Sequence, residues 1–149
     1  MKTLHLCVQQ QNTTALRMAE ILEEHPKDLT SHPEHQLAKK QTKGCGGVVS
    51  CEVGGDLLTA AKFICSLKIL YIAPSFGGCE SIVDQPAVMS YWDLSQLDRA
   101  KYGIMDNLVR FSFGVEDLKT GPASSYKPDT IKGGSTQAKQ RSFAWEEIS

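Results

Sequence analysis

The sequence predicts an α/β fold in which one sheet is covered by helices. Residues 48–53 alternate apolar and polar side chains, as a half-buried strand does. Residues 57–67 repeat apolar side chains at helical spacing, and residues 69–73 follow directly as an apolar run rich in Ile and Tyr. A strand, a helix and a second strand in this order indicate one sheet with helices packed on it.

The chain begins with a predicted amphipathic helix over residues 4–24. Its apolar residues recur at helical spacing: Leu4, Val8, Ala15, Met18, Ala19 and Leu22. The polar stretch 10–14 contains weak helix formers, so a break with a second helix start at this point is an open alternative. Pro26 follows the helix, and the residue before a proline is disfavoured in helical conformation, so we expect the helix to end there.

A second helix is predicted over residues 31–42. Ser31 and Glu34 have the spacing of a capping box, which opens a helix. His32 and His35 are three residues apart on this helix, so a metal pair is conceivable. No carboxylate or cysteine accompanies them at the spacings of known metal sites, so we expect two solvated histidines and no metal.

The middle of the chain supplies the strand, helix and strand described first. Gly54 and Gly55 predict the turn after the strand at 48–53, and Asp56 is the expected N-cap of the helix at 57–67. The strand at 69–73 is expected to be buried, and Pro74 ends it because proline has no backbone N–H.

The last predicted elements are a helix and a strand. Residues 80–90 are expected to be mostly loop, and Asp93 is the expected cap of a helix over residues 94–102 that ends at Gly103. Residues 107–115 predict a strand with two unlike faces. One face carries Val109, Phe111, Phe113 and Val115, and the other carries Leu108, Arg110, Ser112 and Gly114.

Composition excludes several classes of protein. The chain has 149 residues, 41% hydrophobic and 22% charged, as an ordinary globular domain has. Its formal net charge is −1, which gives no reason to expect nucleic acid as a partner. No apolar run is long enough to span a membrane, and we find neither a secretory signal nor a transit peptide at the start.

The five cysteines predict free thiols in a reducing compartment. They are Cys7, Cys45, Cys51, Cys65 and Cys79. Their number is odd and none forms a Cys-x-x-Cys pair, so neither a disulfide scaffold nor a zinc site is expected. Cys79 is the only one inside a candidate site, the segment after residue 74 that is discussed next, but we expect it to be a buried, unreactive thiol.

The loop after the strand at 69–73 is a candidate anion site. Ser75 supplies a hydroxyl, while Gly77 and Gly78 allow positive φ and a close approach of the backbone to a ligand. Free N–H groups in such a loop suit a carboxylate or a phosphate. On these residues alone, a tight turn between core elements is the commoner interpretation, and it stays open.

Arg110 is the second candidate, because a guanidinium in the middle of a strand needs a partner. Its planar fork suits a carboxylate bound through two hydrogen bonds. That carboxylate could belong to a ligand or to an internal acid such as Asp84 or Glu80. The aromatic residues Tyr91 and Trp92 could also face a ligand, although we expect both in the core.

Two long motifs carry a resemblance to a known family. Pro-Ser-Phe-Gly-Gly-Cys-Glu-Ser-Ile-Val-Asp-Gln-Pro-Ala-Val-Met-Ser-Tyr occupies residues 74–91, and Asp-Asn-Leu-Val-Arg-Phe-Ser-Phe-Gly-Val-Glu-Asp occupies residues 106–117. In this order and separation they resemble the C-terminal domain of the Cys/Met-metabolism pyridoxal-phosphate enzymes, closest to the plant-type γ-synthase branch. The resemblance extends from Met1 to about Asp117.

The resemblance implies a small C-terminal domain at residues 1–118, with a mainly antiparallel sheet of about three to four strands covered by helices on one side. Family members carry an additional strand near residues 27–31, which this sequence lacks. Residues 119–149 depart from the family pattern and are expected to be a disordered tail. The large, cofactor-binding domain is expected to be absent from this chain.

The resemblance also implies a function. The γ-synthase branch uses pyridoxal 5'-phosphate to join an activated homoserine ester to cysteine, giving cystathionine for methionine biosynthesis. Arg110 matches the arginine that binds the substrate's α-carboxylate, and Ser75 matches the serine beside it. The lysine that forms the Schiff base has no match here, so we expect this chain alone to be inactive and unable to bind the cofactor covalently.

Two alternatives remain open. The chain could be a non-catalytic, truncated module that docks with full-length subunits or forms a homo-oligomer, or it could belong to a γ-lyase or sulfhydrylase branch. The expected small-molecule partner is an amino acid, and neither nucleic acid nor membrane is expected. The resemblance implies a chloroplast location, with the cytoplasm as the alternative because no transit peptide is found.

Overall fold

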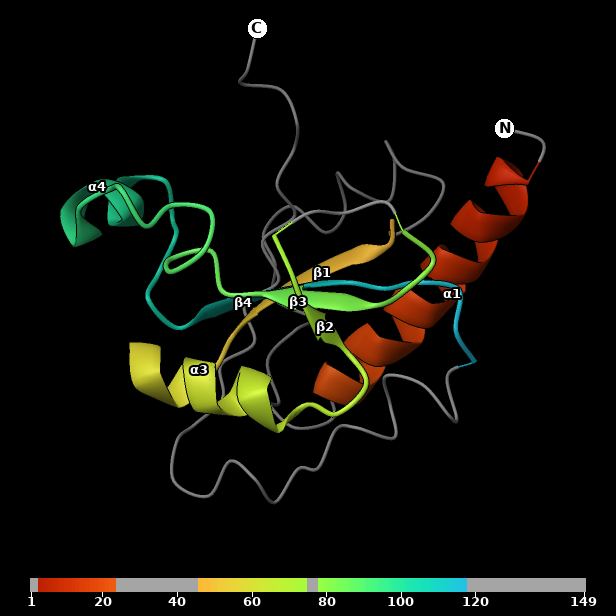
Figure 1. Cartoon of the computed structure of the whole chain (residues 1–149), viewed down its shortest axis with the longest axis horizontal. Coiled ribbons are helices and arrows are strands. Elements are labelled where there is room, and N and C mark those ends of the chain that lie inside the picture. The colour runs from red at the N-terminus through yellow and green to blue at the C-terminus, as the bar shows by residue number, and fades with distance from the viewer. Residues whose placement is uncertain (1–2, 24–45, 75–77, 118–149) are drawn as a thin grey trace, which may run out of the picture.

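A computed structural model describes residues 3–23, 46–74 and 78–117, and Figure 1 shows their arrangement. The elements in chain order are α1 (Leu4–Glu23), β1 (Val48–Glu52), α3 (Leu57–Ser66), β2 (Tyr71–Ile72), β3 (Ile82–Asp84), α4 (Gln96–Lys101) and β4 (Leu108–Ser112). The helix predicted over 31–42, the strand missing near 27–31 and the tail at 119–149 lie outside the described residues.

The strands form one four-stranded sheet in the order β1-β4-β3-β2. β4 pairs antiparallel with β1 and with β3, whereas β2 and β3 are parallel. The predicted class, a small α/β domain with a mainly antiparallel sheet, is confirmed. One row across the sheet places Arg110 of β4 directly between Ser50 of β1 and Asp84 of β3.

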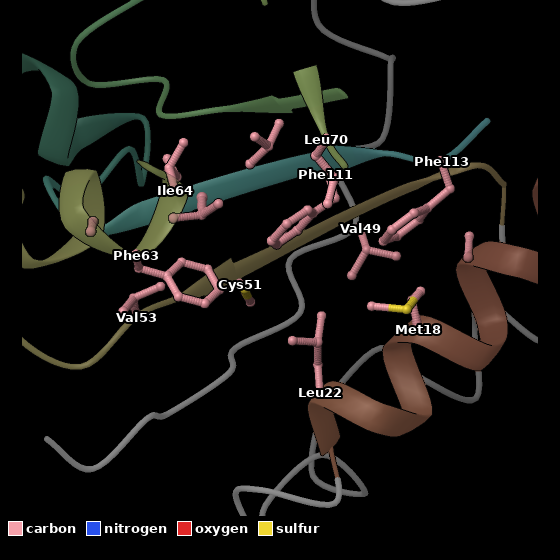
Figure 2. Close-up of a cluster of buried hydrophobic side chains, with 14 residues drawn as sticks. Met18, Leu22, Val49, Cys51, Val53, Phe63, Ile64, Leu70, Phe111 and Phe113 are labelled. Carbon is pink, nitrogen blue, oxygen red and sulfur yellow. The ribbon is translucent and has the colours of Figure 1, made fainter. Parts of the chain in front are cut away.

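The hydrophobic core lies between one face of the sheet and the helices α1 and α3. Figure 2 shows Val49 of β1 and Phe113, which follows β4, turned toward Met18 and Leu22 of α1. The α3 side chain of Phe63 meets Phe111 edge-on, with ring centroids 6.4 Å apart. Burying aromatic side chains removes much apolar surface from water, so the contact between this face of the sheet and the two helices stabilises the fold.

α1 runs without a break through the polar stretch at 10–14, so the predicted alternative of a second helix start is not what forms. Thr14 in that stretch is buried, followed by Ala15, Met18 and Leu22. This spacing places all four on the stripe that faces the sheet. Tertiary packing of that stripe outweighs the weak helix propensity of the polar residues.

α3 begins as predicted. The side chain of Asp56 caps it by accepting a hydrogen bond from the Thr59 N–H at 2.8 Å, and a second from the Thr59 hydroxyl at 2.7 Å. Gly55, just before the cap, has φ of +112°, a conformation that glycine adopts without strain. Ala60, Phe63 and Ile64 form the buried stripe of this helix.

One prediction about strands was wrong, and one strand was not predicted. Residues 80–90 are mostly loop and turn, as predicted, but Ile82–Asp84 within them form β3, an interior strand of the sheet. The run at 69–73 is not a buried strand, because only Tyr71–Ile72 are in β2 and both side chains are exposed. β2 is an edge strand with one partner, and its outer side has no strand against it among the described residues.

The segment between β3 and β4 also differs from expectation. The cap of α4 is Ser95 and not Asp93, and the helix is correspondingly shorter. Gly103 follows its last turn with φ of +72°, as a C-terminal glycine does. Tyr91 and Trp92 are exposed, Trp92 to 74%, so the prediction that they pack in the core was wrong. They lie in a series of turns that no described element covers.

Candidate functional site

Arg110 lies on the face of the sheet opposite the core. Its neighbours along β4, Val109 and Phe111, point into the core and are almost fully buried, so the alternation along the strand turns Arg110 the other way. Its side chain is 23% exposed. The predicted division of this strand into an apolar and a polar face is confirmed at these positions.

The Arg110 guanidinium is bound to an acid of its own chain. Its Nη2 donates a short hydrogen bond to Asp84 Oδ2, and the two side chains form an ion pair. The Ser90 hydroxyl donates to the same Asp84 oxygen at 3.2 Å, and Arg110 Nη2 also reaches Ser90 Oγ at 3.4 Å. Three side chains from β3, β4 and the turn after β3 therefore belong to one polar cluster.

The acid in this cluster is fully buried. The Asp84 side chain has 0% exposure, and its Oδ1 has no hydrogen-bond partner among the described residues. The pKa of Asp84 is raised overall, because burial outweighs the lowering by the Arg110 guanidinium and the Ser90 hydroxyl. Arginine stays protonated in proteins, so Arg110 places a permanent positive charge beside this buried carboxyl group.

Ser75, the other predicted site residue, lies outside the described residues, and so does the loop 75–77. The chain that leads to it can be placed. The Ala73 N–H donates to the Val83 carbonyl at 3.2 Å, so Ala73 lies beside the end of β3. Only β3 separates it from β4, and two strand spacings amount to about 10 Å. The described chain before Ser75 therefore ends beside the strand that carries Asp84, the residue opposite Arg110.

A second contact between the two motifs was missed by the sequence analysis. Glu116 accepts hydrogen bonds from both the N–H of Ser81, through a short bond, and the Ser81 hydroxyl at 2.8 Å. The N–H of Gly114 donates to Ser81 Oγ at 2.9 Å, and the N–H of Val115 donates to the Cys79 carbonyl at 2.9 Å. These bonds fix the chain just after the glycine loop onto the extension of β4. These residues lie within the two motifs at 74–91 and 106–117, but nothing in the spacing of either motif indicates that the two segments are in contact.

The described cysteines range from buried to exposed, with Cys7 half-buried. Cys7, Cys51, Cys65 and Cys79 are free, as predicted, and Cys45 lies outside the described residues. Cys79 is exposed, so the prediction of a buried thiol was wrong. Its backbone carbonyl is held by Val115, but its side chain is on the surface. Cys51 is buried in the core, and burial raises the pKa of its thiol to about 12.

The described residues hold no cluster of three or more potential metal ligands, and His32 and His35 lie outside them. None of the described helices is long and apolar enough to cross a bilayer.

Comparison with known proteins places this sequence in a family. The model of the Cys/Met metabolism PLP-dependent enzymes matches residues 1–120. The chain is 79% identical over 125 residues to cystathionine gamma-synthase 1, chloroplastic, of Nicotiana tabacum, covering 79% of this chain and 23% of the relative. It is 71% identical over 126 residues to the protein of the same name from Arabidopsis thaliana, covering 80% of this chain and 22% of the relative. Cystathionine gamma-lyase of Dictyostelium discoideum is 38% identical over 125 residues, 79% of this chain and 32% of the relative.

Pyridoxal phosphate is the cofactor of this family, and the lysines of the described region do not fit its covalent attachment. Lys62, Lys68 and Lys101 are all exposed side chains. The Lys101 ammonium is paired with Asp98 at 2.6 Å. A Schiff-base lysine needs a site that excludes water, and these three exposed positions do not provide one.

The chain spans about a quarter of the length of the two gamma-synthase relatives, and its matched region contains both motifs, the Arg110 cluster and the contact between Ser81 and Glu116. Because the family model matches well over half of its residues, the chain belongs to the Cys/Met metabolism PLP-dependent enzyme family.

Proposed function

We propose that this chain supplies the substrate-carboxylate-binding part of a cystathionine γ-synthase. The complete enzyme would join an activated homoserine ester to cysteine by γ-replacement, giving cystathionine. In this proposal Arg110 binds the α-carboxylate of the amino-acid substrate and Ser75 assists beside it. The chloroplast is the proposed compartment, because two of the relatives carry that location in their names.

The observation that carries the proposal is the difference in identity between branches of the family. The three gamma-synthase relatives are 79%, 71% and 56% identical to this chain, whereas the gamma-lyase relatives are 38–39% identical over segments of similar length. The difference favours the synthase branch over the lyase branch.

The chemistry of Arg110 supports the same proposal. A guanidinium presents five N–H donors in a rigid plane, which matches the two oxygens of a carboxylate. Its place on the polar face of β4 leaves the side chain in partial contact with solvent. The sequence left open whether Arg110 pairs with an acid of its own chain, and it does pair with Asp84. This ion pair explains why a carboxyl group can be buried at that position. Ligand binding at the same guanidinium stays a proposal.

A chimera tests this function. The matching segment of the Nicotiana tabacum relative is replaced by residues 1–120 of this chain, and cystathionine formation is measured from cysteine and an O-acylated homoserine. The chimera is expected to be active. Arg110→Ala in it should raise the KM for the homoserine ester about 100-fold, because a charge-assisted pair contributes roughly 3 kcal/mol.

The matched control is Arg17→Ala on α1. Arg17 is exposed and paired with Glu20 on the helix surface, so its loss should leave the KM unchanged. An Arg110→Ala chimera with the KM of the parent would contradict the proposal.

The chain by itself is proposed to be a non-catalytic module, because the lysines of the described region do not fit the cofactor. The purified 149-residue chain is mixed with pyridoxal phosphate and its absorbance spectrum recorded. We expect the spectrum of the free cofactor. A stoichiometric absorbance band of lysine-bound cofactor would contradict this part of the proposal. Co-purification with a full-length relative would favour a module that docks with complete subunits.

A further inference from the structure

The Asp84 carboxylate is the feature of the site that the proposed function does not use. Its side chain is completely buried, and Arg110 is the cation that pairs with it among the described residues. The two residues are directly opposite each other on neighbouring antiparallel strands, so the backbone itself sets their distance. The pair is therefore built into the sheet and does not depend on a flexible loop.

This geometry has two physical consequences for Arg110. First, the guanidinium is held from one side by Asp84 and Ser90, which removes rotamer freedom from a long side chain before any ligand arrives. Second, the buried carboxylate offsets the positive charge of the guanidinium. A ligand carboxylate that approaches Arg110 is attracted by the guanidinium. It is also repelled by the Asp84 carboxylate on the far side of that guanidinium, so the net attraction is weaker than that of an isolated arginine.

The strength of this repulsion follows from Coulomb's law. Two carboxylates on opposite edges of one guanidinium are about 6 Å apart, and this cluster lies between the interior and the solvent. Even at an effective dielectric constant of about 40, higher than the roughly 20 of pairs near a protein surface, the repulsion corresponds to roughly a tenfold change in a binding constant, so about tenfold is the least effect expected.

We propose that Asp84 sets how tightly Arg110 binds a substrate carboxylate: it holds the guanidinium in place on the polar face of the sheet and weakens its affinity for a second carboxylate about tenfold. Asp84 is thus a positioning residue that acts through Arg110. The proposal rests on the proposed function, because it concerns the same guanidinium. It gives the site a pre-ordered arginine whose hold on an amino acid is moderate, so that the bound carboxylate can leave.

The test uses the full 149-residue chain, labelled with ¹³C and ¹⁵N, and acetate as the probe. Sodium acetate replaces sodium chloride at constant ionic strength, and the Arg110 Nε–H signal is followed to obtain the dissociation constant for acetate. The variants are Asp84→Asn, which keeps the shape and removes the charge, and Arg110→Ala. The matched control is Asp98→Asn, which makes the same change in net charge at an exposed acid of α4.

We expect Asp84→Asn to lower the dissociation constant about tenfold and Asp98→Asn to leave it unchanged. Binding to the Arg110→Ala variant, followed through the backbone amides of β4, should be lost. If Asp84→Asn binds acetate as weakly as the unaltered chain does, or more weakly, the proposal for Asp84 is wrong, while loss of binding in Arg110→Ala would still support the proposed function. Unchanged binding to Arg110→Ala would overturn both.

A second measurement needs no variant at Asp84. In the unaltered chain, the ¹³C signal of the Asp84 carboxylate should move during the acetate titration with the same midpoint as the Arg110 Nε–H signal, because both anions share one guanidinium. A stationary Asp84 signal beside a shifting Arg110 signal would overturn the proposal even if Asp84→Asn failed to fold.

Discussion

Gly114 is the position at which the structure predicts the largest effect of adding one methyl group. It lies just beyond β4, where its N–H donates to the buried Ser81 hydroxyl at 2.9 Å. A Cβ built on Gly114 would overlap the Cys79 carbonyl oxygen and the Glu116 carboxylate, and would lie 2.7 Å from the Cys79 carbonyl carbon. Neither the backbone at Cys79 nor the Glu116 carboxylate can give way without breaking the hydrogen bonds that join the two motifs.

The magnitude follows from two contributions. Overpacking by one methyl group costs about 1–3 kcal/mol in a tightly packed site. Moving the Cys79 backbone away from Gly114 would also weaken two or more hydrogen bonds, each contributing about 1 kcal/mol. We therefore expect Gly114→Ala to lower the free energy of unfolding by about 3–5 kcal/mol, a large part of the total stability of a small domain.

The assay is urea unfolding of the full chain, followed by far-ultraviolet circular dichroism. Gly46→Ala is the control, because Gly46 has φ of +72° but no atom within 4 Å of a Cβ built on it. Its substitution adds backbone strain of about 1–2 kcal/mol without a clash. If Gly114→Ala were no more destabilising than Gly46→Ala, the close contact with Cys79 would not exist in solution.

Two further predictions concern the thiols and one helix cap. At pH 8 a disulfide reagent should modify the exposed Cys65 and Cys79 readily but leave Cys51 unmodified until the chain unfolds, since Cys51 is buried and its pKa is raised to about 12; equal rates for all three would refute the buried position of Cys51. Hydrogen bonds from Thr59 lower the pKa of Asp56, so its contribution to stability is present above its unfolded-state pKa and is lost as the pH falls through the lower folded-state value. Asp56→Asn should therefore be less stable than the unaltered chain at pH 7, and the difference should shrink below about pH 4; a difference in urea midpoint that stays constant down to pH 2 would contradict this cause.

Local signals in the sequence predicted the parts of the fold that local interactions stabilise. Asp56 caps α3 because its acceptor and the Thr59 N–H are three residues apart. Val109 and Phe111 were placed on one apolar face of their strand because alternation is a local pattern, and both are buried. In both cases the deciding partners are close in sequence or repeat regularly.

The failure to predict β3 has a physical cause, which is the presence of partners far away in the chain. β3 was missed because two buried polar residues, Ser81 and Asp84, flank and end it, so it does not have the composition of an interior strand. Both are tolerated there because Glu116 and Arg110, 35 and 26 residues away, satisfy them. No spacing rule links positions at such separations.

The cap of α4 was missed for a different reason, since Asp93 and Ser95 are both good N-cap residues. Ser95 is the cap because Asp98, three residues later, exchanges hydrogen bonds with it. The Asp98 N–H donates to Ser95 Oγ at 3.2 Å, and the Ser95 hydroxyl donates back to the Asp98 carboxylate at 2.6 Å. For the candidate site, the sequence named Asp84 as one possible partner of Arg110, but only the strand register decides between Asp84 and Glu80.

The order of the strands has a consequence for how the chain acquires its structure during synthesis. Among the strands that the structure describes, β4 is the last to leave the ribosome, yet it lies between β1 and β3. Until residue 112 has emerged, β1 lacks the strand that it pairs with in the described sheet, and β2 and β3 can pair only with each other. A nascent chain stopped earlier would therefore expose unpaired strand edges. Such intermediates aggregate readily, so chaperone dependence should rise sharply for nascent chains halted just before β4.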